Sequence, residues 1–184
     1  MMTRVIRIAA AASLAAALPL AAQRVGTVEV GAFARYTDFD NSLGLGNRVG
    51  VGGRGAVYVR PNLALELEVS RTSANRPGGS VSYTPVHARV VGAFATGGRA
   101  EVLLGGGYVR NSYGRALAVS DGGVSVLLGL RYRVAERLWL RAGLDADAMF
   151  STDSRPSNPL PFYTGNWGLQ LGATLRLNGG GGQL

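Results

Sequence analysis

Apolar and polar residues alternate along most of the chain after residue 25, as they do in β-strands with two unlike faces. The clearest segment runs from Trp167 to Leu177, where odd positions are Trp, Leu or Ala and even positions are Gly, Gln, Thr or Arg. The segment from Leu138 to Phe150 alternates in the same way. Further segments cover residues 28–36, 48–59, 63–70, 86–94, 100–108 and 124–133. The pattern therefore predicts eight strands.

The predicted connections between these strands alternate in length. Short turns fall at residues 60–62, 96–99 and 134–137, and long loops rich in Gly, Ser, Asn, Asp and Pro fall at 37–47, 72–80, 111–122 and 151–162. We expect a bulge at Pro85, because Val81 and Tyr83 are out of phase with the apolar residues that follow. Short turns at one end and long loops at the other predict an all-β fold, an eight-stranded antiparallel up-and-down transmembrane β-barrel.

The first 22 residues have the organisation of a secretory signal peptide. Arg4 and Arg7 precede an apolar run at residues 8–20, and the small residues Ala21 and Ala22 follow it. The run is shorter than the roughly 18 residues that a membrane anchor needs. We expect a signal peptide at 1–22, the barrel at 23–178 and a flexible Gly-rich tail at 179–184. Export favours the outer membrane of a Gram-negative-type bacterium.

A soluble, lipocalin-like barrel would show the same alternation, so the contents of the two faces must distinguish it from a membrane barrel. Nine glycines share the parity of the charged residues, as expected where long side chains fill a narrow lumen. On the apolar face, aromatic residues gather near strand ends, as in the girdles at membrane interfaces. This predicted girdle contains Tyr36, Phe94, Tyr108, Tyr132, Phe150 and Tyr163. Both observations favour the membrane barrel.

The polar face carries charges of both signs, which a narrow lumen must pair or hydrate. We expect Arg54 to face Glu68 across a hairpin, and Glu29 to meet Arg176 where the barrel closes. Arg131 and Arg141 face each other, so we expect Asp145 to neutralise them. The predicted ion-pair network comprises Glu29, Arg35, Arg48, Arg54, Glu66, Glu68, His87, Arg89, Glu101, Arg131, Arg133, Arg141, Asp145, Asp147 and Arg176. A plug of ion pairs is favoured over the alternative, a conducting small-solute pore.

Composition limits the remaining chemistry. The chain has 184 residues with 28 Gly, no Cys and no Lys, which excludes disulfides and thiolate metal sites. Without residues 1–22 it has 17 Arg against 11 acidic residues, but export argues against nucleic acid as a partner. His87 is the only histidine, so we expect no enzyme activity, cofactor or metal; a lipid-active enzyme remains the alternative. Arg71 and Arg110, outward at the loop ends, are either solvated charges or contacts for lipid and lipopolysaccharide phosphates.

Two stretches resemble hairpins of the OmpA/OmpX-like outer-membrane β-barrel domain family: GRGAVYVRPNLALELEVS, from Gly53 to Ser70, and LLGLRYRVAERLWLRAGLDA, from Leu127 to Ala146. The resemblance covers nearly all of residues 25–177. It implies a monomeric eight-stranded barrel, structural or adhesive rather than enzymatic, that the barrel-insertion machinery assembles among outer-membrane lipids. The chain departs from the family in two respects. Members often end in an aromatic residue, whereas here Leu177 is followed by a Gly-rich tail. The peptidoglycan-binding domain of longer OmpA proteins is also not expected here.

Overall fold

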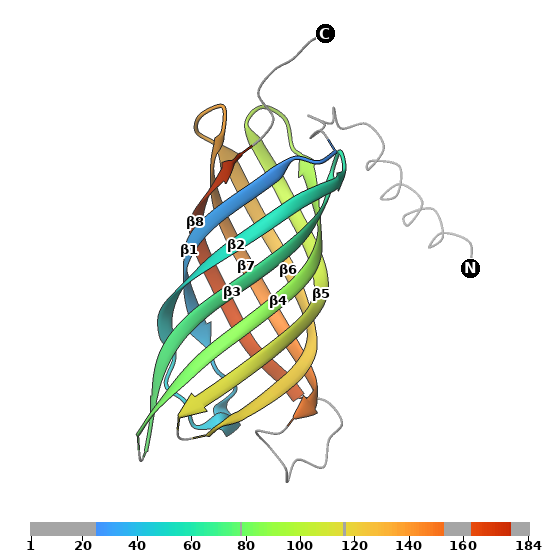
Figure 1. Cartoon of the computed structure of the whole chain (residues 1–184). Coiled ribbons are helices and arrows are strands. Elements are labelled where there is room, and N and C mark those ends of the chain that lie inside the picture. Colours follow the sequence, from blue (N-terminus) through green and yellow to red (C-terminus); the bar gives the residue numbers. More distant parts are fainter. Residues whose placement is uncertain (1–24, 78, 116, 153–162, 178–184) are drawn as a thin grey trace, which may run out of the picture.

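The computed structural model describes residues 25–177, apart from 78, 116 and 153–162. These residues form one closed barrel in which each strand pairs with its neighbour in sequence and β8 pairs antiparallel with β1, which confirms the predicted fold (Figure 1). The strands are β1 (Val28–Asp38), β2 (Arg48–Arg60), β3 (Leu63–Arg76), β4 (Gly79–Ala95), β5 (Ala100–Arg115), β6 (Val119–Arg133), β7 (Leu138–Thr152) and β8 (Tyr163–Arg176).

The two ends of the barrel differ. One end, here called the turn end, carries the β2–β3, β4–β5 and β6–β7 turns together with residues 25 and 177. The other, the loop end, carries a nine-residue connection at 39–47 that contains the short 3₁₀ helix η2 (Asn41–Leu43). Figure 1 shows the turn end at the top and the loop end at the bottom. The predicted signal peptide and tail lie outside the described residues.

Two of the four predicted long loops are strand instead. β3 and β4 run on to Arg76 and Gly79, and β5 and β6 run on to Arg115 and Val119, so only two or three residues join each pair. Asn and Gly, which recur in these segments, are depleted in strands by propensity. Here they continue the ladder because strand pairing, as of Thr72 with Tyr83, extends the sheet beyond the apolar outer surface.

The predicted bulge at Pro85 is wrong. The β3–β4 register is the same for Val69–Val86 as for Thr72–Tyr83, and Pro85 pairs in register with Asn111. Val81 and Tyr83 therefore point inward, on the same face as His87. The apolar residues change face because the loop end of the lumen is itself apolar. Register shifts occur elsewhere, at 58/60, 122/123 and 146/148.

The inner-face glycines let neighbouring backbones and long side chains come close. A methyl group at Gly107 would overlap the carbonyl oxygen of Ala88 and lie 2.7 Å from the Cα of Arg89. At Gly55, whose missing side chain would point outward, a methyl group would meet nothing within 4 Å. Much of the Gly content thus follows from a crowded lumen, because an eight-stranded barrel is only wide enough for its own side chains.

The outer surface between the two ends is a continuous apolar belt. Leu, Val and aromatic side chains from all eight strands are exposed on it, for example Leu67, Val126 and Leu171. No helix among the described residues is long and apolar enough to cross a membrane. The polar residues are inside, which is the reverse of a water-soluble barrel.

Candidate functional site: the closed lumen

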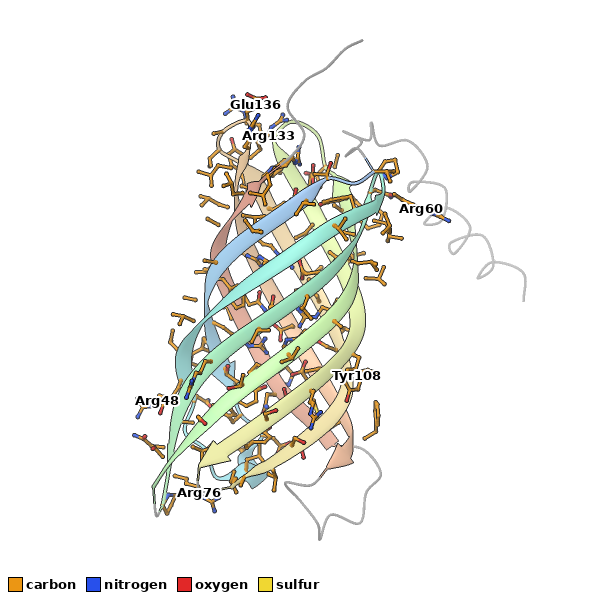
Figure 2. The ribbon with its side chains drawn as sticks, in the orientation of Figure 1. Arg48, Arg60, Arg76, Tyr108, Arg133 and Glu136 are labelled. Atoms are coloured by element: carbon orange, nitrogen blue, oxygen red, sulfur yellow. The ribbon has the colours of Figure 1, made fainter. Side chains whose placement is uncertain are left out.

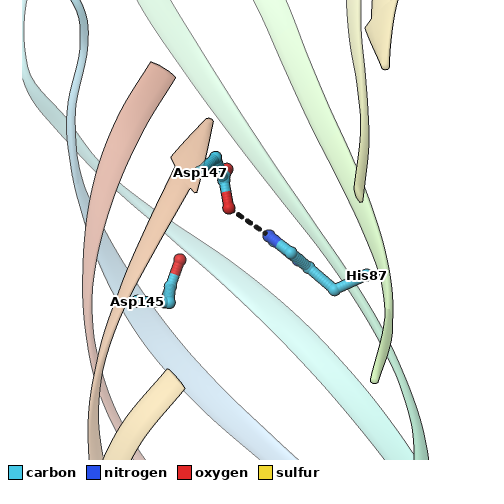
Figure 3. Close-up of side chains that lie close together, drawn as sticks. All are labelled: His87, Asp145 and Asp147. Carbon is cyan, nitrogen blue, oxygen red and sulfur yellow. Dashed lines mark hydrogen bonds and ion pairs between the residues drawn. The ribbon is translucent and has the colours of Figure 1, made fainter. Parts of the chain in front are cut away.

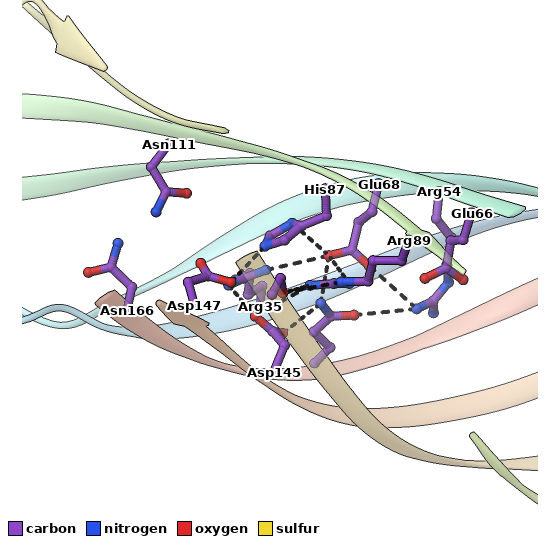
Figure 4. A network of polar contacts seen from close by, with 12 residues as sticks. Arg35, Arg54, Glu66, Glu68, His87, Arg89, Asn111, Asp145, Asp147 and Asn166 are labelled. Atoms are coloured by element: carbon purple, nitrogen blue, oxygen red, sulfur yellow. Dashed lines mark hydrogen bonds and ion pairs between the residues drawn. The ribbon is translucent and has the colours of Figure 1, made fainter. Parts of the chain in front are cut away.

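The centre of the lumen is an ion-pair layer built around Glu68 and Asp145 (Figure 4). Arg35 bridges them, with 2.5 Å from its Nη2 to Asp145 Oδ2 and 3.4 Å from its Nη1 to Glu68 Oε1. Arg89 lies 3.6 Å from Glu68 and 3.7 Å from Asp145. Gln170 donates its amide to both carboxylates, at 2.6 and 2.9 Å. The side chains of both arginines and both acids are completely buried, so each charge depends on these partners.

His87 joins this layer to a third carboxylate (Figure 3). Its Nε2 lies 3.2 Å from Asp147 Oδ1, and its Nδ1 lies 3.6 Å from Glu68 Oε1. His87, Asp145 and Asp147 each offer one ligand atom, all within 4.8 Å of one another, which is a spacing a metal ion could use. However, the guanidinium of Arg35 already contacts Asp145 and would repel a cation there. The arrangement fits an ion-pair cluster better than a metal centre.

A second layer lies toward the turn end. Arg141 makes a bidentate pair with Glu66, in which Nη1 contacts Oε2 and Nη2 donates to Oε1 at 3.0 Å. Arg54 stands opposite Glu68 in the β2–β3 register, with 4.0 Å between Nη1 and Oε2. It also lies over the ring of Phe33, 5.1 Å from the ring centroid. Bidentate and stacked contacts are the ones that the planar guanidinium makes best.

A third layer closes the turn end. Arg131 contacts Glu29 at 2.8 Å and Glu101 at 2.5 Å. Arg176 reaches Glu29 at 3.2 Å, across the β1–β8 junction that closes the barrel. The buried indole of Trp139 lies beneath three arginines, at 4.6, 5.6 and 5.7 Å from their guanidinium carbons. These are Arg131, Arg176 and Arg133, respectively.

Arg131 and Arg141 do stand opposite each other in the β6–β7 register. The expectation that Asp145 neutralises them is wrong, because Arg131 pairs with Glu29 and Glu101 while Arg141 pairs with Glu66. Asp145 pairs instead with Arg35 and Arg89. Strand tilt brings side chains from well-separated strands to one level of the lumen, so Glu29 reaches Arg131, and Glu66 reaches Arg141, across the barrel. Glu101, in contrast, stands directly opposite Arg131 in the β5–β6 register.

The loop end is closed by apolar contacts, with residues 39–47 folded over the mouth as a lid. Phe39, Leu43 and Leu45 of this lid are buried in a cluster with inward residues of β3, β4 and β5. The Phe39 ring packs edge-on against Tyr83 at 5.0 Å. Those inward residues are Ala74, Val81, Tyr83 and Tyr113.

Hydrogen bonds hold the lid to both sides of the mouth. The Gly46 amide donates to the carbonyl of Asn75 on β3 at 3.1 Å. The Asp40 amide donates to Asn166 Oδ1 on β8 at 3.2 Å. Asn166 also donates to the hydroxyls of Tyr83 and Tyr113, both at 3.0 Å, so one amide joins the lid to the layer below it.

Sequence reasoning missed two groups of inward residues. Val91, Ala93, Leu103 and Leu127 form an apolar cluster inside the lumen, although the alternation predicts a polar inner face. Asp121, near the loop end of β6, is buried and was assigned to a loop. Parity is the signal that could have found the first group. Leu103 and Leu127 share phase with glycines and charged residues, and Val91 and Ala93 share phase with His87 and Arg89.

Two predicted network members are placed differently from the rest. Arg48 is exposed at the loop end of β2, outside the lumen, which corrects its assignment to the network (Figure 2). Arg133 is half-buried at the turn end, over Trp139. The remaining members contribute to the three layers described above. They are Glu29, Arg35, Arg54, Glu66, Glu68, His87, Arg89, Glu101, Arg131, Arg141, Asp145, Asp147 and Arg176.

The predicted aromatic girdle lies on the outer surface where its side chains are described. Its exposed members are Tyr36, Phe94, Tyr108, Tyr132 and Phe150, and Figure 2 shows Tyr108 pointing away from the barrel. The side chain of Tyr163 lies outside the described residues. Trp167, half-exposed beside Tyr36 at the loop end, adds an aromatic residue that the predicted set lacks.

The ion pairs among the described lumen residues join six arginines to five carboxylates, and a sixth carboxylate, Asp147, contacts His87. The arginines are Arg35, Arg54, Arg89, Arg131, Arg141 and Arg176, and their acidic partners are Glu29, Glu66, Glu68, Glu101 and Asp145. The six arginines and six carboxylates of this set carry equal and opposite formal charge. A balanced interior is what burial requires, because an unpaired charge in a desolvated lumen is costly.

A closed eight-stranded barrel with an apolar outer belt and a polar lumen defines a class, the small outer-membrane barrels. A model of the outer membrane protein beta-barrel domain matches residues 8–176, and the chain belongs to this family. Members of this family are outer-membrane β-barrel proteins.

Three solved structures illustrate the likeness in fold. The N-terminal barrel domain of Pseudomonas aeruginosa OprF has 17% identity and a TM-score of 0.57, over 85% of this chain and 99% of that chain. Neisserial surface protein A has 17% identity and a TM-score of 0.56, over 83% and 96%. OprG of P. aeruginosa has 10% identity and a TM-score of 0.59, over 88% and 100%. A comparison with curated protein sequences finds no match.

Proposed function

We propose that this protein is a monomeric integral outer-membrane barrel with a closed lumen and a structural or surface-interaction role. The observation that carries the proposal is the filling of the lumen at every level. Ion pairs occupy the centre and the turn end, and the apolar lid cluster occupies the loop end. Eight strands enclose a space that side chains can fill completely, which leaves no aqueous path.

The outer surface supports a membrane location with a defined orientation. The belt of exposed Leu and Val, with aromatic residues toward its edges, has the composition of a lipid-facing wall. Short turns at one end and the lid at the other favour a periplasmic turn end and an extracellular loop end. In this proposal the signal peptide directs export, and the barrel-insertion machinery then assembles the protein among outer-membrane lipids.

Conductance in planar bilayers tests the closed lumen. We expect the folded protein to give no stable current steps under conditions in which a general porin conducts. A stable open channel of about nanosiemens size would contradict the proposal, because such a bore is wider than a filled eight-stranded lumen allows. Heat-modifiable gel mobility of the same sample is the control, because it shows that a protein preparation that gives no current is nevertheless folded.

A lipid-active enzyme is disfavoured by the position of the only histidine. His87 is completely buried between Glu68 and Asp147, below the lid and away from the lipid-facing surface. A general base must lie within hydrogen-bonding reach of its substrate, directly or through one water. We expect the folded protein to release no fatty acid from phospholipid vesicles. Turnover that disappears in a folded His87→Ala variant would restore the enzymatic alternative.

A further inference from the structure

The apolar belt is interrupted by a groove on its outer side, across β2 to β5. Small residues form its floor, namely Gly55 on β2, Ala88 on β4 and Gly106 on β5. A methyl group would meet nothing within 4 Å at Gly55, and only the carbonyl of Ser125, at 3.7 Å, at Gly106. The groove has a volume of about 690 Å³, and its walls include the exposed side chains of Leu65, Leu67 and Val90.

Two outward arginines mark the loop-end edge of the belt on the same strands. On β3 the outward residues Leu65, Leu67 and Val69 are followed by Arg71. On β5 the outward Tyr108 is followed by Arg110, which donates to Ser120 Oγ at 3.3 Å. Both arginines are exposed. On the intervening strand β4, Val86 pairs with Arg110, and the hydroxyl-bearing Thr84 lies two residues further toward the loop end. Guanidinium groups bind phosphate oxygens in bidentate fashion.

The spacing between the two features fits within one membrane leaflet. Arg71 is four residues from Leu67, and Arg110 is four residues from Gly106, which at about 3.3 Å per residue is roughly 13 Å along the strands. Because barrel strands are tilted by about 35–45°, this corresponds to about 10 Å of depth along the membrane normal. The hydrocarbon of one leaflet is about 15 Å deep, half of a core of about 30 Å. A lipid whose phosphate lies at the two arginines therefore has an acyl chain long enough to reach the groove.

We propose that the outer wall of β2 to β5 binds one phosphate-bearing lipid of the extracellular leaflet. Its phosphate lies between Arg71 and Arg110, and one of its acyl chains fills the groove over Gly55 and Gly106. This inference rests on the proposed membrane location and adds a specific lipid site to it. The wall of β6 to β8 carries a smaller hollow of about 440 Å³, lined by Leu130, Leu140 and Leu171, and the proposed site is the larger groove on β2 to β5.

Native mass spectrometry of the detergent-folded full chain tests the site. The protein is mixed with diphosphorylated lipid A, phosphatidylglycerol or inorganic phosphate, and the bound species are counted. We expect one lipid to be retained per chain, and inorganic phosphate alone not to be retained. Comparing the retention of lipid A with that of phosphatidylglycerol identifies which phosphate-bearing lipid the site prefers. Retention of either lipid supports the site.

Two variants separate the headgroup from the groove. We expect the double variant Arg71→Gln/Arg110→Gln to weaken retention about tenfold or more, the value of one or two charge-assisted hydrogen bonds. The matched control is Arg60→Gln, an exposed arginine at the turn end of β2, which is the opposite end of the barrel from the pair, and it should leave retention unchanged. Gly55→Leu/Gly106→Leu fills the groove and should also weaken retention, although it leaves both arginines in place.

Three results would overturn the site. The first is equal retention by the double arginine variant and the wild type. The second is an equal loss in the Arg60→Gln control, and the third is a mass of two chains in place of one chain plus lipid. Heat-modifiable mobility shows that each variant is folded. Flotation of the protein with vesicles tests the membrane proposal separately, so a protein that floats but retains no lipid loses only the lipid site.

Discussion

At the scale of single residues, Glu68 is the centre of the lumen. Its carboxylate lies within 4.0 Å of three arginines and His87, and it also accepts a hydrogen bond from Gln170. Its side chain has no exposed surface. Removing one member of such a buried cluster leaves charge without compensation, which costs more than the pairing contributes relative to an apolar core.

We therefore expect Glu68→Gln to lower the free energy of unfolding by about 3–5 kcal/mol. The measurement is urea unfolding of the barrel in lipid vesicles, followed by tryptophan fluorescence and gel mobility. Glu136→Gln, in the exposed β6–β7 turn, is the matched control and should change stability by less than about 0.5 kcal/mol. Similar losses in the two variants would show that Glu68 does not organise the lumen.

Two adjacent glycines on β5 give a second test at this scale. Gly107→Ala should prevent or severely weaken folding, because its methyl group would overlap the backbone of β4 at Ala88. Gly106→Ala, which points outward, should fold normally. The fraction of heat-modifiable barrel after refolding measures both. Normal yields for Gly107→Ala would mean that the β4–β5 pair can separate without cost.

At the scale of elements, alternation located the eight strands because each has one lipid-like face and one polar face. The alternation failed at Val81 and Tyr83, because the inner face of the barrel becomes apolar there. Apolar residues on the inner face look like a shift in register, and the pattern therefore predicted a bulge at Pro85. It also missed the strands beyond the belt, because their outer residues, such as Ser82 and Ser112, no longer need to be apolar. The β2–β3 register places Arg54 beside Glu68, and the β1–β8 register at the closure of the barrel places Glu29 beside Arg176. The partners of Asp145 depend on strand tilt, which no local pattern contains.

The lid is an element whose stability can be tested by itself. Phe39→Ala removes its main aromatic contact with Tyr83, and truncation of a buried phenylalanine costs about 3–5 kcal/mol. We expect the amide of Gly46, which is bonded to Asn75, to exchange hydrogen much faster in this variant. Exchange in the central strands should stay unchanged. Protection of Gly46 equal to the wild type would mean that the lid is held by its polar contacts alone.

At the scale of the whole molecule, the lumen is an electrically neutral interior. Each of the six arginines and the five acids that pair with them is tolerated only because its opposites lie close by in the lumen. The bidentate pair of Glu66 and Arg141 is well suited to a direct test, since each carboxylate oxygen contacts one guanidinium nitrogen.

Glu66→Leu and Arg141→Leu should each destabilise the barrel by about 3–5 kcal/mol when made alone. The double variant Glu66→Leu/Arg141→Leu restores neutrality and should be much closer to the wild type. Unfolding free energies of the four proteins form a double-mutant cycle. Additive losses in the double variant would contradict pairing between the two residues.

The pairing of distant strands has a consequence for the order of events during assembly. Arg35 and Asp145 are 110 positions apart in the chain, and Arg131 and Glu29 are 102 apart. Neither carboxylate can meet its arginine until β1 has joined β8. A half-built sheet would carry Arg35 and Glu29 without these partners, although Arg131 would already have Glu101 on the neighbouring strand β5. Only a completely closed barrel in the correct register brings all of these charges together.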